Sequence, residues 1–368
     1  MEAFSNEFRL VLACCRWPVT PEVRDCVARA AAGVDWEQAE RVARRHRVEG
    51  LVWNALREAA VEVPAGTAQA LAASATDIAR QNLFIVHECL RLDTLLRQAG
   101  IPVLFLKGIT LARLAYGTVG LKRGWDIDFI VPPEAVGAAA ELLNQAGYEC
   151  TLPGPSHSAA GIAAWHRNSK ESVWNHVTKE VHVELHTSLS DNRRLLPELS
   201  AASPAQEAEV AAGRTLRTLE HDRLFAYLCV HGASSGWFRL KWLADLGAFL
   251  AGQSPAEIER LYRRAGEFGA GRSAAQGLLL SSRLLGTELT RALEAELNAD
   301  RVNRWLVKSA IRLMTGLNEA TELHHRRLGT LPIHLMQLAL LPGWRFKVSE
   351  ASRQLREVSG RAAGLLRG

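Results

Sequence analysis

Residues 101–132 contain an apolar segment that carries two aspartates, and this combination restricts how the chain can fold. The run 125–131 (WDIDFIV) is rich in β-branched and aromatic residues and lies between a glycine-containing turn and two prolines. Such a run predicts a β-strand. Side chains two apart on a strand share a face, so Asp126 and Asp128 would project together while Trp125 and the other apolar residues point into a core. The alternative is an exposed edge strand with two solvated acids.

The spacing of apolar residues divides the chain into three parts. Residues 1–99 have helical periodicity and predict an N-terminal helical subdomain, and residues 191–368 predict a C-terminal one. Residues 100–190 between them alternate between strand and helix patterns. The predicted fold class is therefore α+β, with a small mixed β-sheet core flanked by two helical subdomains. Within the core we expect strands at 101–106, 125–131 and 148–152, helices at 109–116 and 133–146, a loop at 153–169, and a hairpin of 172–177 with 180–185. After residue 189 we expect helices, with a linker at 195–213.

The composition is that of an ordinary globular protein, and it narrows the classes of partner. The net charge is +5 and the pI is about 9.0, which permits a polyanionic ligand such as a nucleoside triphosphate. No stripe of Lys and Arg interleaved with aromatic residues is evident, so nucleic acid is not the expected partner. The six cysteines lack zinc-site spacing, which predicts reduced and mostly buried thiols. We expect no membrane span and a cytoplasmic location.

A third acid belongs to a second alternating strand. In the run EVHVEL, Val181, Val183 and Leu185 would face one way, and His182, Glu184 and His186 the other. If this strand lies beside the aspartate strand, Asp126, Asp128 and Glu184 converge on one face. Such a set can hold two divalent cations about 3.5–4 Å apart for displacement at phosphorus. Hard oxygen ligands favour Mg²⁺ or Mn²⁺.

The turn that precedes the aspartate strand has the character of a phosphate site. Lys107 and Gly108 lie where the first predicted strand meets a helix, and the N-terminus of a helix attracts anions. Gly108 allows close backbone approach, Lys107 supplies a cation, and Thr110 adds a hydroxyl in the first helical turn. Arg123 is placed to neutralise further phosphate charge. The alternative for Lys107 is a side chain that merely extends to solvent.

These motifs resemble the nucleotidyltransferase superfamily of the DNA polymerase beta type, and within it an uncharacterised nucleotidyltransferase family with helical regions on both sides of the core. The resemblance rests on LKGITLARLAYG, then Arg123 with DIDFIV, then VHVELH, then His231 with KWLADL. It implies that Asp126 and Asp128 bind the metals that bridge the nucleotide phosphates, that Glu184 completes the catalytic metal site, and that Lys107 and Gly108 hold the triphosphate. The sequence has Gly-Ile where the superfamily commonly has Gly-Ser or Gly-Gly.

Four further residues are candidates for a role near the acceptor. His182 and His186 would share a face with Glu184, where they could contact the acceptor, support the metal ligands, or be structural. The resemblance suggests that the helical block 222–250 packs over the active site, so His231 or Lys241 could touch nucleotide or acceptor. For Lys241 the alternative is a surface ion pair with Asp245, four residues on.

The predicted function is transfer of a nucleoside monophosphate from an NTP to an acceptor, with Mg²⁺ or Mn²⁺ as cofactor and release of pyrophosphate. A small molecule, a peptide and a protein side chain are all compatible acceptors. The alternative prediction is a non-catalytic, nucleotide-binding regulatory protein.

Overall fold

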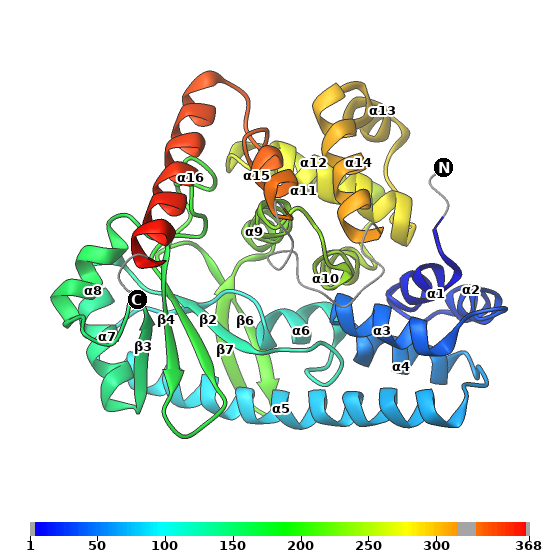
Figure 1. Cartoon of the computed structure of the whole chain (residues 1–368), viewed down its shortest axis with the longest axis horizontal. Coiled ribbons are helices and arrows are strands. Elements are labelled where there is room, and N and C mark those ends of the chain that lie inside the picture. Colours follow the sequence, from blue (N-terminus) through cyan, green and yellow to red (C-terminus); the bar gives the residue numbers. More distant parts are fainter. Residues whose placement is uncertain (1–3, 316–328, 366–368) are drawn as a thin grey trace.

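The computed structural model describes residues 4–315 and 329–365. It is an α+β structure in which a mixed sheet and its covering helices lie between two helical regions, as predicted (Figure 1). Among the described residues, five strands pair in the order β1-β2-β5-β4-β3. Strands β2 and β5 are parallel, whereas the other neighbouring pairs are antiparallel. The sheet is therefore mixed, and its only parallel pair joins the two predicted acid-bearing strands.

The N-terminal helices begin at polar caps. The side chains of Ser5, Thr20 and Asp35 each accept a hydrogen bond from a backbone N–H in the first turn, which satisfies donors that a helix start leaves free. The longest helix, α5, runs beneath both the other N-terminal helices and the sheet (Figure 1). Helix α5 thereby joins the N-terminal helical region to the sheet. The N-terminal helices are α1 (Asn6–Cys14), α2 (Pro21–Ala30), α3 (Trp36–His46), α4 (Glu49–Glu58) and α5 (Ala65–Gln98).

The core follows the predicted alternation of strands and helices. The expected hairpin is present, because β4 pairs with β5 in antiparallel register. Helices α7 and α8 pack on each other and on the strands β3 and β4. The elements of the core are β1 (Leu104–Phe105), α6 (Ile109–Tyr116), β2 (Asp126–Ile130), α7 (Val136–Gln145), β3 (Tyr148–Leu152), α8 (Ala159–His166), β4 (Glu171–His176) and β5 (His182–His186).

Three local predictions were wrong. The expected loop at 153–169 contains helix α8, which starts at a Ser158 cap. The expected linker and the start of the following helical region form a separate hairpin of β6 (Ala205–Ala211) and β7 (Arg214–Leu219). Its alternation is hard to recognise because the inward positions of β6 include the polar Gln206 and the small Ala208 beside Val210. Trp125, expected in the core, is 47% exposed, since β2 begins only at the next residue.

The C-terminal region is helical, and it lies across the sheet from α5 (Figure 1). Close packing in it depends on glycine: a Cβ on Gly232 would lie 2.4 Å from the buried ring of Trp237. Helix α12 is followed by a π-helical turn at Ser281–Leu285. The helices are α9 (His221–Ser234), α10 (Leu240–Leu250), α11 (Pro255–Glu267), α12 (Gly271–Leu280), α13 (Arg291–Ala299), α14 (Arg301–Thr315), α15 (Leu331–Gln337) and α16 (Trp344–Leu365).

Two hydrophobic clusters form the interior. One joins the N-terminal and C-terminal helices, and the other lies between α5, the sheet and α7. The division into subdomains at residues 99 and 190 stays a prediction. All six cysteines are free, and five of them are buried, which confirms the predicted thiols. No helix in the described ranges is long and apolar enough to cross a bilayer.

Candidate active site

The register of three strands brings acidic and histidine side chains onto one face of the sheet. On the parallel strands β2 and β5, Asp128 pairs with Glu184. On the antiparallel strands β4 and β5, Glu171 pairs with His186. Directly paired residues have side chains on the same face. The alternation of side chains along these two strand segments therefore produces the predicted convergence of Asp128 and Glu184.

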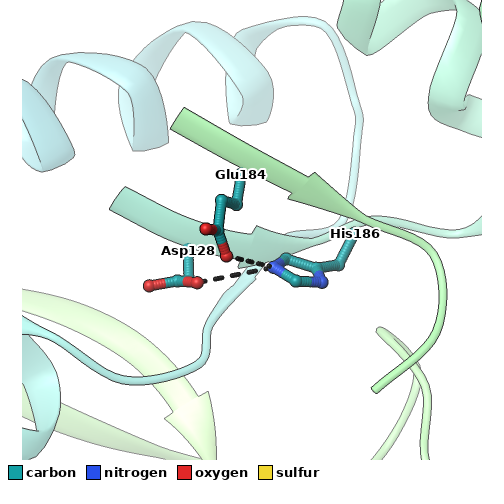
Figure 2. Close-up of side chains that lie close together, drawn as sticks. All are labelled: Asp128, Glu184 and His186. Carbon is teal, nitrogen blue, oxygen red and sulfur yellow. Dashed lines mark ion pairs between the residues drawn. The ribbon is translucent and has the colours of Figure 1, made fainter. Parts of the chain in front are cut away.

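Asp128, Glu184 and His186 form a compact group, here called the carboxylate cluster (Figure 2). His186 Nε2 lies 3.5 Å from Asp128 Oδ1 and 3.5 Å from Glu184 Oε2. One potential ligand atom from each residue lies within 4.8 Å of the others. Asp128 and His186 are buried, with 3% and 2% of their surface exposed. Asp128 Oδ1 and both ring nitrogens of His186 make no hydrogen bond to the described residues.

Lys107 neutralises part of this charge. Its Nζ lies 3.0 Å from Asp128 Oδ1 and 4.0 Å from Glu184 Oε2. Burial opposes ionisation of Asp128, but Lys107 and His186 outweigh it and hold the pKa of Asp128 well below its usual value. Burial and the charge of Asp128 raise the pKa of Glu184 to about 7. Burial works against protonation of His186, yet its contacts with Asp128 and Glu184 raise its pKa to about 9.

A fourth acid, Glu171, adjoins the cluster and was missed from the sequence. Glu171 Oε2 lies 3.5 Å from His186 Nδ1 and 3.1 Å from Lys170 Nζ. Burial disfavours the ionised form of Glu171, but Lys170 and His186 lower the pKa of its carboxyl overall. The signal that could have found this acid is its position one residue before the predicted hairpin, because the turn length sets a register that, extended by one residue, places Glu171 opposite His186.

A pocket opens beside the carboxylate cluster and shares Asp128 with it. Its walls come from the β1–α6 turn, the loop before β2, and helices α9 and α10. We call it the cation pocket because basic side chains approach it from three of these segments. Its polar lining consists of Lys107, Lys122, Arg123, Asp126, Asp128, His231, Lys241 and Asp245, with Gly108, Gly124, Leu111, Trp125, Leu228 and Trp242 between them.

The backbone around this pocket is held by specific residues. Gly108 has φ = +65° at the start of α6, a conformation that L-residues with a Cβ rarely adopt. Asn82, fully buried on α5, fixes the loop before β2: its Nδ2 donates to the carbonyls of Val119 and Lys122, both at 2.6 Å, and its Oδ1 accepts from Gly124 N–H at 3.2 Å. The walls of the pocket are thus set by the fold.

The basic side chains of the pocket differ in whether a carboxylate pairs with them. Lys122 lies 3.4 Å from Asp245, and Arg123 lies 2.8 Å from the buried Glu49. Asp245 is buried and also accepts a hydrogen bond from Tyr116 at 3.0 Å, so the alternative interpretation of Lys241, a surface ion pair with Asp245, was wrong. No carboxylate in the described ranges lies within ion-pair distance of Lys241. Burial and the charges of Lys122, Lys107 and Arg47 lower the pKa of Lys241 to about 7.

The remaining predicted site residues occupy distinct positions. Asp126 lines the cation pocket but lies outside the carboxylate cluster. Thr110 is buried, and its hydroxyl donates to the carbonyl of Lys107 at 3.2 Å, so it braces the turn from within. His182 is exposed, and its Nδ1 forms a hydrogen bond of 2.7 Å with Oδ1 of Asn175. His231 lies in the pocket wall, where burial and the charges of Lys107 and Lys170 lower its pKa well below the usual value.

No curated protein matches this chain. The profile of an uncharacterised nucleotidyltransferase family, however, matches residues 32–286. The match includes α5, the whole sheet and the helices that line the cation pocket. It covers well over half of the sequence and agrees with the family that the sequence motifs resemble. The chain therefore belongs to the uncharacterised nucleotidyltransferase family, whose activity is nucleotidyl transfer.

Proposed function

We propose that the protein transfers a nucleoside monophosphate from an NTP to an acceptor in a metal-dependent reaction that releases pyrophosphate. The observation that carries this proposal is the position of Asp128, which belongs both to the carboxylate cluster and to the wall of the cation pocket. A site for divalent metal and a site for polyanionic phosphate are thereby adjacent. Phosphoryl and nucleotidyl transfer require this combination of positioning and charge.

The donor set fits a divalent metal. Asp128 and Glu184 supply carboxylate oxygens, and the buried Asp128 Oδ1 already faces a cationic group, so a metal ion could take the same position. Asp126 lies two residues away on the same strand face, where it would contribute from the nucleotide side. Bound Mg²⁺ or Mn²⁺ would neutralise phosphate charge and activate the attacking oxygen. In the free protein the Lys107 ammonium contacts the same Asp128 oxygen.

The residues of the cation pocket would bind the triphosphate. Gly108 exposes the backbone at the start of α6, where N–H groups and the helix dipole favour an anion. Lys107, Lys122, Arg123 and Lys241 would hold phosphate oxygens so that the α-phosphorus faces the carboxylate cluster. Electrostatic stabilisation of this kind commonly contributes the largest share of catalysis. Pyrophosphate would leave toward the cation side of the site.

The acceptor is proposed only as a class: a small molecule, a peptide or a protein side chain, with Glu184 adjoining the attacking hydroxyl or amine. Helices α9 and α10 form one wall of the pocket, and no aromatic and basic stripe of the kind that binds nucleic acid accompanies it in the sequence. We therefore do not propose a nucleic-acid acceptor.

A matrix of metals and nucleotides tests this function. The purified protein is incubated with each NTP, with Mg²⁺, Mn²⁺ or EDTA, and with a panel of acceptors, and pyrophosphate release is measured together with acceptor mass. We expect metal-dependent pyrophosphate release and an acceptor that gains one nucleoside monophosphate. Tight NTP binding without turnover across the whole panel would instead indicate a non-catalytic, nucleotide-binding regulatory protein. Absence of NTP binding would contradict both functions.

A further inference from the structure

The proposed metal site contains one side chain that the reaction chemistry does not call for. His186 lies at the end of β5, buried between Asp128 and Glu184 on one side and Glu171 on the other. A histidine in this position must satisfy two ring nitrogens, yet neither makes a hydrogen bond to the described residues. Buried polar atoms without partners are uncommon and call for an explanation.

We propose that His186 is a direct metal ligand beside Asp128 and Glu184, and that Glu171 is the positioning residue that orients its ring. This inference rests on the metal-dependent function proposed above. It makes the centre a mixed nitrogen and oxygen site rather than an all-carboxylate one. The ligand it would take is therefore a divalent cation that accepts imidazole, with Mn²⁺ preferred over Mg²⁺.

The geometry around the ring supports both roles. His186 Nε2 faces the two carboxylates at 3.5 Å, and its Nδ1 faces Glu171 Oε2 at 3.5 Å. A metal-binding histidine commonly donates its second N–H to a carboxylate, which fixes the tautomer and the ring orientation. Here the pairing of β4 with β5 places Glu171 directly opposite His186. Lys170, 3.1 Å from Glu171, keeps that carboxylate charged.

Other roles for these histidines fit the structure less well. With 2% of its surface exposed, His186 is covered from solvent and is not placed to meet an acceptor that enters from outside. The neighbouring His166 is no rival ligand, because its Nδ1 lies 3.0 Å from the Thr187 hydroxyl and its Nε2 lies 3.0 Å from the Ser172 hydroxyl. His186 is thus the imidazole of this region whose Nε2 faces the two carboxylates.

The test uses Mn²⁺ as a spectroscopic probe. The full-length protein, with ¹⁴N- or ¹⁵N-labelled histidine, is loaded with Mn²⁺ and a non-hydrolysable ATP analogue, and electron spin echo modulation is recorded. Isotope-dependent nitrogen modulation is expected from the wild type and its absence from His186→Gln. For Glu171→Gln, in which His186 is intact, we expect Mn²⁺ affinity to fall by about tenfold or more, and the Mn²⁺ over Mg²⁺ preference to persist.

Two variants of exposed residues serve as matched controls. His157→Gln and Glu149→Gln alter exposed residues of the same region and should leave Mn²⁺ affinity and the nitrogen signal unchanged. Mn²⁺ bound through oxygen alone in the wild type would overturn this inference but leave the proposed function standing. No Mn²⁺ binding at all would count against the metal-dependent function itself. Equal Mn²⁺ affinity in Glu171→Gln and wild type would remove the positioning role of Glu171.

Discussion

The carboxylate cluster and the cation pocket share Asp128 but differ in how their charges are balanced. Each acid of the cluster, and the adjoining Glu171, has a basic neighbour within 4.0 Å: Lys107 contacts Asp128, His186 contacts Glu184, and Lys170 contacts Glu171. The cation pocket includes Lys241, for which no carboxylate of the described ranges is within ion-pair distance and whose pKa is lowered to about 7. One region is nearly neutral as it stands, and the other holds unbalanced positive charge.

This difference shows which region is complete without a ligand. A buried charge without a partner is costly and is retained where a ligand supplies the missing charge. The cation pocket is therefore the part of the site that gains most from a polyanion. The cluster gains from a cation only if that cation replaces Lys107 at Asp128 and the proton of His186, so the binding of metal and of nucleotide should be coupled through Lys107.

The largest effect should come from the residue common to both regions. We expect Asp128→Asn to lower pyrophosphate release by about 10³-fold, since it removes a buried charge at the reacting centre, and to abolish Mn²⁺ binding without nucleotide. Asp126→Asn should also lower turnover, but should retain Mn²⁺ binding because Asp126 lies outside the cluster. Turnover assays and Mn²⁺ titrations followed by electron paramagnetic resonance measure both quantities, with the exposed Asp25→Asn as control. Equal loss of Mn²⁺ in both variants would place Asp126 among the ligands of the same ion.

Replacement of Lys107 should affect the two ligands in opposite directions. In Lys107→Met, KM for the NTP should rise by about tenfold or more, because a charged contact to phosphate is lost. The affinity for Mn²⁺ without nucleotide should increase, since no ammonium competes for Asp128 Oδ1. Isothermal titration of each ligand separates these effects, and Lys308→Met on the exposed face of α14 is the control. Weaker binding of both ligands would mean that Lys107 only supports the local fold.

The two regions also differ in how far the sequence predicted them. Periodicity predicted that Asp128 and Glu184 each lie on the polar face of a strand, but it did not predict that these strands, 56 residues apart, pair with each other. Glu171 was missed because its partner His186 is defined by the register of a hairpin rather than by a motif. Local patterns thus predicted the acids Asp128 and Glu184, but not the neighbouring Glu171.

The cation pocket was predicted only in part. Lys107 and Gly108 are recognisable from the strand-to-helix turn, whereas the pairing of Lys122 with Asp245 joins residues more than a hundred positions apart. No short-range pattern encodes such a contact, so the alternative pair of Asp245 with Lys241 could not be rejected from the sequence. Trp125 was placed in the core because the strand was predicted one residue too long at its start.

Removal of the unbalanced cation should stabilise the free protein while it weakens nucleotide binding. In Lys241→Met we expect KM for the NTP to rise by several-fold, up to about tenfold. In the wild type, Lys241 has a pKa of about 7 when folded, against the ordinary lysine value of 10.5. The unfolded chain therefore binds more protons between pH 7 and 10.5, and the free energy of unfolding gains a contribution that increases with pH across this window.

Denaturant titrations at several pH values measure this contribution of Lys241 to the free energy of unfolding. Lys241→Met should be more stable than the wild type at pH 6, and the advantage should shrink as the pH approaches 10.5. Lys347→Met, which removes an exposed lysine on α16, should follow the wild-type curve. A Lys241→Met variant that is less stable than the wild type at pH 6 would show that the side chain has a compensating partner, and the contrast between the two regions would disappear.

The smallest effect should come from the backbone that both regions share. Gly108 has φ = +65°, and an added Cβ would meet only the carbonyl oxygen of Asp126, at 3.5 Å. The cost of Gly108→Ala is therefore conformational rather than steric, about 1–3 kcal/mol in the free energy of unfolding. Gly66→Ala, within α5 and with no atom near its Cβ, should be neutral or stabilising. If the turn shapes the phosphate site, Gly108→Ala should raise KM for the NTP and leave Mn²⁺ affinity unchanged, because the ligands of the carboxylate cluster lie on β2 and β5. A parallel loss of Mn²⁺ affinity would show that the β1–α6 turn supports both regions.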